Sequence, residues 1–190
     1  MSGRKNSDIE KFKPVAVEQG TVQTEAQSQA QSQLHPFSPV FDKNSQILIL
    51  GSFPSVKSRE NGFFYGHPQN RFWRVLAYVF GFDGELKTIG QKREFLLTNG
   101  VALWDVIAFC NIEGSSDASI KNAVPTDLSD IFSAADIKKI FVNGKTAEKY
   151  YNKYQKDLVG RSAVCLPSTS PANAAWSFDA LAKAWRQEIL

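Results

Sequence analysis

The sequence predicts an α/β protein with three layers, in which helices cover both faces of a central, mostly parallel sheet of four strands. Short apolar runs bounded by turn residues alternate with stretches of helical period. The apolar runs are nearly continuous, which is typical of parallel strands buried on both faces. With 43% apolar residues in 190 positions, the chain can form one globular domain with an ordinary core.

Residues 1–34 are expected to form a disordered tail. Their segment "TVQTEAQSQAQSQ" has no aromatic residue and no apolar period, so it cannot bury enough surface to offset its chain entropy. The proline-punctuated "LHPFSPVF" follows and indicates an extended entry into the fold. Residues 35–190 are therefore expected to form the domain.

Four strands and five helices are expected within this domain. The strands are expected at 46–50, 101–106, 138–144 and 162–167. The helices are expected at 70–81, 91–100, 128–135, 145–154 and 178–190. Because ligands of such sheets bind beyond the carboxyl ends of the strands, the loops that follow the four strands are expected to meet in a crevice.

The segment after the first expected strand has an unusual composition. "GSFPSVKS" is a turn with little bulk, which lets backbone N–H groups approach a ligand closely, although an ordinary turn after a strand looks the same. In "GHPQN", Pro68 followed by Asn70 indicates the start of a helix, with His67 and Asn70 facing the crevice. A structural hydrogen bond is an equally good explanation of His67.

Aromatic residues are concentrated in the same segment. Phe63, Phe64 and Tyr65 offer rings on which a flat group could stack. The helical period of "FWRVLAYVF" assigns Phe72 and Trp73 to the core instead. The segment is therefore expected to supply both a ligand platform and part of the core.

The loop after the last expected strand, "STSPANAAWS", contains no bulky side chain from Ser168 to Ala175. Small hydroxyl residues around Pro171 make a tight loop that can bind phosphates through backbone and hydroxyl groups. A turn that leads to a helix N-cap at Ser177 is the structural alternative, and both can hold at once.

Several other chemistries are not indicated by the sequence. It contains no His/Cys/carboxylate cluster with zinc spacing, no GxGxxG, no P-loop and no GxSxG elbow. Cys110 and Cys165 are too few for a disulfide framework and are expected to be buried thiols. Neither a metal nor a cofactor is expected. The net charge of +3 permits nucleic-acid binding through a local patch.

Together these loops resemble the uracil-DNA glycosylase superfamily, in particular its mismatch-specific uracil/thymine branch and the related hypoxanthine-DNA glycosylases. The mismatch-specific branch has a Gly-x-x-Pro loop after the first strand, then an aromatic residue and His-Pro-x-Asn-Arg-Phe-Trp. Gly51, Pro54, Tyr65 and residues 67–73 match these elements. The second motif of the superfamily is similar to "PSTSPANA". The resemblance spans 36–190 and implies a uracil-DNA glycosylase-like fold and a DNA glycosylase that needs no cofactor.

Two departures from the superfamily pattern bear on the substrate. The mismatch-specific branch has a water-activating Asn where this chain has Phe53, so the polar role is expected to fall to Asn70. The uracil-specific enzymes read the base with an Asn at the end of the second strand, where this chain has Asp105. An ionised carboxylate only accepts hydrogen bonds, so it repels a carbonyl edge and favours the N1–H of hypoxanthine over uracil.

The resemblance also implies roles for individual residues. Asn70, with His67, is expected to orient the water that attacks C1′ of the sugar. The base, rotated out of the duplex, is expected to stack on Tyr65 with Phe53 or Phe64 on its other side. The expected base-binding residues are Ser52, Phe53, Phe64, Tyr65, Asp105 and Ser116, of which Ser116 could equally belong to a helix cap. The expected DNA-contacting residues are Ser168, Thr169, Ser170, Pro171, Ala172 and Asn173.

The favoured function is hydrolytic excision of a deaminated base, hypoxanthine first, leaving an abasic site for base-excision repair. A G:U or G:T mismatch enzyme, with Asp105 protonated or turned away, is one alternative. A DNA-binding protein that has lost catalysis, motivated by Phe53, is another. The expected partner is DNA with deaminated bases, bound by a monomer. No apolar run is long enough to span a membrane and no signal-peptide pattern is present, so a cytoplasmic, nucleoid-associated location is expected.

Overall fold

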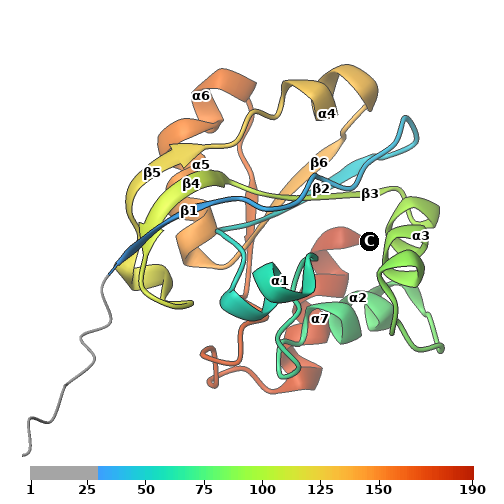
Figure 1. The fold of residues 1–190 in the computed structure, drawn as a ribbon. Coiled ribbons are helices and arrows are strands. Elements are labelled where there is room, and N and C mark those ends of the chain that lie inside the picture. Colours follow the sequence, from blue (N-terminus) through green and yellow to red (C-terminus); the bar gives the residue numbers. More distant parts are fainter. Residues whose placement is uncertain (1–29) are drawn as a thin grey trace, which may run out of the picture.

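The computed structural model describes residues 30–190 and contains two sheets surrounded by helices (Figure 1). The larger sheet has the strand order β3-β2-β6-β7, and all its neighbouring pairs are parallel. Its strands are β2 (Ile47–Gly51), β3 (Val101–Asp105), β6 (Lys139–Asn143) and β7 (Val164–Leu166). The expected α/β class is confirmed, and each expected strand agrees with an observed one to within two residues at either end.

Helices pack on both faces of this sheet (Figure 1). One face is covered by α2 (Phe72–Phe80), α3 (Ile89–Thr98) and α7 (Phe178–Ile189). The other face is covered by α4 (Ser129–Ala134) and α5 (Lys145–Tyr154). Successive residues of a strand point to opposite faces, so Ile49 joins the first of the two cores while Leu48 and Leu50 join the second. All five expected helices are present.

Helix α2 is fixed at its start by a residue of the quoted motif and at its end by a glycine. The Asn70 side-chain oxygen accepts a hydrogen bond from the Phe72 N–H at 3.0 Å and thereby satisfies one of the free donors of the first turn. Gly81, with φ of 65°, closes the helix in the left-handed conformation that glycine adopts without strain. Phe72 and Trp73 are 0% and 8% exposed, as their helical period predicts.

A second, antiparallel sheet was not expected from the sequence. It has the order β1-β4-β5 and consists of β1 (Gln31–Leu34), β4 (Ile107–Ile112) and β5 (Lys121–Pro125). The predicted tail boundary at residue 34 is therefore wrong by four residues, because the polar strand β1 is held by backbone pairing to β4 rather than by apolar burial. The remaining prediction of disorder, for residues 1–29, lies outside the described residues.

The remaining helices are short. They are α1 (Val56–Asn61), the 3₁₀ turn η1 (Asp117–Ser119) and α6 (Lys156–Val159). Helix α1 follows directly on the loop after β2 and so lies near the carboxyl end of the large sheet. The turn η1 lies at the same end, because its Asp117 accepts a hydrogen bond from Ser52, the residue after β2. Within residues 30–190, no helix combines the length and apolar character needed to span a bilayer.

Candidate active site

The carboxyl ends of β3 and β6 and the loops after β2 and β7 meet in one cavity of about 360 Å³. This size lies at the lower end of the range for small-molecule sites. The loop after β2 contributes residues 51–55, and the loop after β7 contributes residues 168–172. Asp105 ends β3 and Asn143 ends β6, and both line the same cavity. The crevice expected from the topology is therefore present.

Gly51 is required at the floor of the cavity because there is no room for a larger residue. A Cβ atom at this position would lie 2.2 Å from Asp105 Oδ1 and 2.9 Å from Tyr65 Oη. Both oxygens therefore lie within 3 Å of one point above the Gly51 backbone. The absence of a side chain at residue 51 lets two polar atoms from different elements converge on the cavity floor.

His67 and Asn70, the expected catalytic residues, both line the cavity. The Nδ1 atom of His67 accepts a hydrogen bond from the Gln69 N–H at 3.2 Å, which leaves Nε2 as the protonated nitrogen in the neutral ring. The side-chain oxygen of Asn70 is bonded to the Phe72 N–H, so its NH₂ group is the part available to a ligand. Asn70 thus presents a hydrogen-bond donor that is held in place by its bond to the first residue of helix α2.

The expected stacking residues occupy different depths. The Tyr65 ring is stacked on Phe72, with 3.8 Å between ring centroids and 18° between planes, so only its other face can meet a base. Phe53 and Phe64 both line the cavity but are 7% and 2% exposed. Phe64 also packs edge-on against Phe37, so it acts mainly as a wall.

The Tyr65 hydroxyl is a buried side-chain oxygen with no hydrogen-bond partner among the described residues. Desolvation raises the pKa of this hydroxyl, and the neighbouring charge of Asp105 raises it further. Asn143 lies close enough to oppose this shift without completing a hydrogen bond. The hydroxyl is therefore neutral and carries a hydrogen that it can donate. Because an unpaired buried hydroxyl is costly, a hydrogen bond to a ligand on the cavity floor would be favourable.

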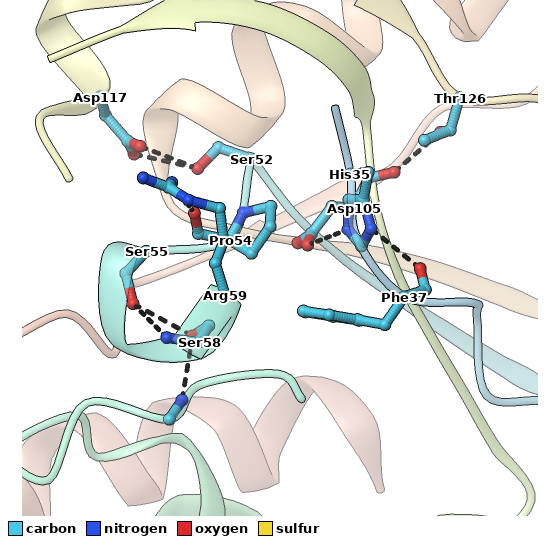
Figure 2. A network of polar contacts seen from close by, with 11 residues as sticks. His35, Phe37, Ser52, Pro54, Ser55, Ser58, Arg59, Asp105, Asp117 and Thr126 are labelled. Atoms are coloured by element: carbon cyan, nitrogen blue, oxygen red, sulfur yellow. Dashed lines mark hydrogen bonds and ion pairs between the residues drawn. The ribbon is translucent and has the colours of Figure 1, made fainter. Parts of the chain in front are cut away.

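Asp105 lines the cavity as expected, but its carboxylate is also bonded to a residue that the sequence did not single out. Asp105 Oδ2 lies 2.9 Å from His35 Nε2, and the two side chains are only 5% and 3% exposed (Figure 2). The other ring nitrogen of His35 lies 2.9 Å from the Phe37 carbonyl. The Asp105 backbone is fixed as well, because its carbonyl accepts from the Thr126 hydroxyl at 2.7 Å.

A second carboxylate, Asp117, also lines the cavity. The Ser52 hydroxyl contacts both of its oxygens, at 3.0 and 3.1 Å (Figure 2). Asp117 is exposed at the cavity mouth, yet the surrounding protein desolvates its carboxyl and raises its pKa, while the Ser52 hydrogen bond opposes this and the charge of Asp105 adds to it. Ser52 is therefore oriented by Asp117.

The small-residue loop after β7 is held by hydrogen bonds from Arg71. The Arg71 guanidinium donates to the carbonyls of Ser170 and Asn173, each at 2.9 Å, and also to that of Trp176. Its backbone N–H donates to the Thr169 carbonyl at 3.1 Å. Several carbonyls of one loop thus converge on a single cation, which fixes the loop without bulky side chains.

Not every expected contact residue is available to DNA. Thr169 is 0% exposed, and it exchanges two hydrogen bonds with the Asn143 side chain, at 2.9 and 3.0 Å. The Thr169 hydroxyl is therefore used inside the protein and is not free to contact DNA. Pro171 and Ala172 are exposed and line the cavity, whereas Ser168 and Ser170 line it half-buried. Asn173 is also half-buried, and its side-chain NH₂ donates to the Ser168 carbonyl at 2.8 Å.

Ser116 is also not where the sequence predicted. It is exposed and does not line the cavity, whereas its neighbours Ser115 and Asp117 do. Residues 107–112 form a strand rather than a loop, and the chain returns to the cavity at Ile112, the last residue of that strand, and then at Ser115 and Asp117. Within residues 30–190, no group of three or more His, Cys, Asp and Glu side chains is placed to hold a metal ion.

Comparison with known proteins agrees with this geometry. The family described as "Uracil DNA glycosylase superfamily" matches residues 38–188, which is most of the chain. The chain belongs to the uracil DNA glycosylase superfamily. The expected superfamily membership is thereby confirmed, and membership supports the expectation that the protein is a DNA N-glycosylase. Of the residues that sequence reasoning missed, Arg71 lies within the quoted motif, but His35 and Asn143 carried no signal of their own.

Two curated relatives and one solved structure are similar to this chain. A protein of Methanosarcina barkeri named hypoxanthine DNA glycosylase is 37% identical over 115 residues, which are 60% of this chain and 73% of that protein. One of Methanosarcina acetivorans with the same name is 34% identical over 142 residues, 74% of this chain and 89% of that protein. The solution NMR structure of an M. acetivorans protein, provisionally assigned as a uracil DNA glycosylase, matches with a TM-score of 0.66 at 32% identity, covering 80% of this chain and 95% of that one.

Proposed function

We propose that the protein is a monofunctional DNA glycosylase that hydrolyses the bond between a deaminated base, hypoxanthine first, and its deoxyribose. The observation that carries this proposal is the Asp105 carboxylate on the floor of the superfamily cavity. The names of the two Methanosarcina relatives support the choice of hypoxanthine. The abasic product would then be a substrate for base-excision repair.

Base choice follows from the edges of the candidate bases. The Watson–Crick edge of hypoxanthine presents N1–H with one neighbouring carbonyl, whereas N3–H of uracil lies between two carbonyls. A carboxylate oxygen that accepts from the ring N–H is therefore repelled by fewer oxygens in hypoxanthine. Asp105 accepts from N1–H, and the unpaired Tyr65 hydroxyl can donate to the adjacent carbonyl. The free face of the Tyr65 ring provides the stacking surface.

The reaction needs a water nucleophile and stabilisation of the leaving base. Water attacks C1′ as the bond from C1′ to the base nitrogen breaks, and that bond's electron pair leaves with the base. One proton of the water goes to the departing base and its hydroxyl stays on the sugar. The NH₂ group of Asn70, with Nε2–H of His67, positions the water oxygen, and hydrogen-bond donors to the leaving base stabilise the charge that develops there.

The product of this reaction is an abasic site without strand cleavage. A bifunctional glycosylase, which also cleaves the DNA strand, requires an amine nucleophile. No lysine is among the described residues that line the cavity. Action as a monomer is part of this proposal. We place the activity on DNA in the cytoplasm, on the sequence argument alone.

The target nucleotide must leave the duplex to reach this cavity. The loop at residues 168–173 is the part that enters or compresses the DNA, because Pro171 and Ala172 are exposed on it and Arg71 holds it rigid. Its backbone N–H groups and the hydroxyls of Ser168 and Ser170 can contact phosphates. A rigid loop reduces the entropy that DNA binding would otherwise have to offset.

A base-release assay tests this proposal. The protein is incubated without added metal with duplexes that carry one hypoxanthine, uracil, xanthine or G:T mismatch, and each sample is analysed with and without alkali. Release led by hypoxanthine, with strand breaks only after alkali, is the expected result. Release led by uracil or thymine would replace the substrate assignment by that of a mismatch enzyme. DNA binding without any release would favour the non-catalytic alternative.

A further inference from the structure

His35 and Asp105 share their protons in a way that the hydrogen-bond geometry determines. The Phe37 carbonyl, 2.9 Å from His35 Nδ1, can only accept, so Nδ1 carries a hydrogen. The contact of 2.9 Å between Nε2 and Asp105 Oδ2 then contains one more proton, held either by the imidazole or by the carboxyl. The pair has no net charge in either arrangement.

Both arrangements leave the same group facing the cavity. Asp105 Oδ2 is occupied by His35 (Figure 2), and Oδ1 is the oxygen that lies next to Gly51 on the cavity floor. If His35 holds the proton, Oδ1 belongs to a carboxylate. If Oδ2 holds it, Oδ1 is the carbonyl oxygen of a carboxylic acid. Oδ1 is a hydrogen-bond acceptor in both cases.

The histidine is held rigidly enough to impose this on Asp105. Its ring lies 4.2 Å from the Trp104 ring and 4.7 Å from the Phe37 ring, measured between centroids. Its backbone N–H donates to the Ala108 carbonyl at 2.8 Å, which ties β1 to β4. The imidazole therefore cannot turn away without disturbing the second sheet.

We infer that His35 is a positioning residue that keeps Asp105 Oδ1 a hydrogen-bond acceptor and so excludes bases whose Watson–Crick ring nitrogen lacks a hydrogen. Deamination converts that nitrogen from an acceptor to an N–H donor, in adenine at N1 and in cytosine at N3. An acceptor at Oδ1 binds the deaminated form and is repelled by the lone pair of the undamaged one. This inference rests on the proposed function and does not concern guanine, which has an N1–H of its own.

Without His35, Asp105 would lose this restriction. A buried carboxyl with no partner is favoured in its neutral form, and its hydrogen can then occupy either oxygen. Oδ1 could donate to a ring nitrogen that lacks a hydrogen. The His35→Phe variant is therefore expected to accept such bases, whereas in His35→Gln the side-chain NH₂ can still donate to Oδ2 and preserve the acceptor.

The test compares single-turnover release of hypoxanthine with release of unsubstituted purine, whose N1 is an acceptor, from otherwise identical duplexes. We expect the rate ratio of hypoxanthine to purine to fall by at least about tenfold in His35→Phe and to stay within about threefold of the original in His35→Gln. Lys149→Ala, at an exposed lysine of α5, serves as the control for handling and stability. Equal slowing of both duplexes in both His35 variants would reduce His35 to a structural residue and overturn the inference.

A measurement on the unsubstituted protein does not depend on how the variants fold. The chain has two histidines, so ¹⁵N NMR of the imidazole nitrogens, assigned with His67→Gln, reports their protonation separately. A hydrogen on His35 Nδ1 is expected, and a neutral ring with an unprotonated Nδ1 would overturn the inference. If the unsubstituted protein releases no base at all, the proposed function fails first. If it releases hypoxanthine but His35→Phe keeps the original rate ratio, only the present inference fails.

Discussion

Arg71 is bound to Thr169, which lies 98 positions later in the chain, through its backbone N–H at 3.1 Å and its side-chain Nε at 3.4 Å. The same guanidinium also holds the carbonyls of Ser170, Asn173 and Trp176. The residue that precedes helix α2 therefore fixes the loop that follows β7. The two motifs that identify the superfamily in this sequence are thus parts of one structure.

Replacing Arg71 by Lys should loosen this loop while leaving the cavity floor unchanged. A lysine has one nitrogen and cannot reproduce the fork that reaches several carbonyls. We expect weaker DNA binding and faster proteolysis within residues 168–176. Arg74→Lys is the matched control, because Arg74 lies on the same helix and packs on the Phe178 ring at 4.5 Å instead of on the loop. Equal DNA affinity in the two variants would contradict this role of Arg71.

Substitutions at Asn70 can separate its bond to the start of helix α2 from its role in catalysis. Asn70→Ser keeps a side-chain oxygen for the Phe72 N–H but removes the NH₂ group, so stability should be nearly unchanged while single-turnover release falls by about 100-fold. Asn70→Ala should lose both and unfold more easily, by about 1 kcal/mol. Thermal melts and release rates of the three proteins measure the two effects. If Asn70→Ser releases base at the original rate, the role of Asn70 is only to hold the start of helix α2.

Gly51→Ala should damage the base site directly. The new methyl group would meet Asp105 Oδ1 at 2.2 Å and Tyr65 Oη at 2.9 Å, so both side chains must move. We expect loss of base release and a decrease of about 1–3 kcal/mol in the free energy of unfolding. Gly90 lies in helix α3, and a Cβ there would be 3.8 Å from Thr88 Oγ1. Gly90→Ala should therefore be neutral or stabilising. An active Gly51→Ala protein would contradict the proposed cavity floor.

The pKa of Asp117 leads to a prediction about pH. Desolvation raises this pKa above its ordinary value of 3.8, so folding favours the neutral carboxyl over the ionised one. The stability that the neutral form contributes is therefore lost as pH rises through the folded-state pKa. Asp117→Asn should therefore be slightly more stable than the original protein at pH 7, by less than about 1 kcal/mol because the residue is exposed to water. The difference should vanish as pH falls below 3.8. Melting temperatures of both proteins across this range measure it, and a gap that widens at low pH would contradict the assignment.

The sequence was sufficient where a feature is local. The buried strands β2, β3 and β6 are short apolar runs, and their order places the loops after them at one edge of the sheet. Residue types within these loops, such as the His67–Asn70 segment, then indicated the cavity. Helix bounds followed from the apolar period and from turn residues such as Gly81.

Features that depend on distant partners were not predictable in this way. β1 is polar, and β5 is mostly exposed, so neither has an apolar pattern, and both are stabilised by pairing with β4. His35 stands in an irregular proline-rich segment and finds its partner, Asp105, 70 residues later. The neighbours Ser116 and Asp117 show the same limit, because only the path of the backbone around η1 decides which of them faces the cavity.

The central claim, that Asp105 reads the excised base, is tested most directly by the relative rates at which the original protein and Asp105→Asn release hypoxanthine and uracil. An amide can both donate and accept, so it suits an edge that contains carbonyl and N–H groups. The account predicts that the rate ratio of uracil to hypoxanthine rises in Asp105→Asn, even if both rates fall. A parallel decrease of the two rates, with the ratio unchanged, would contradict it.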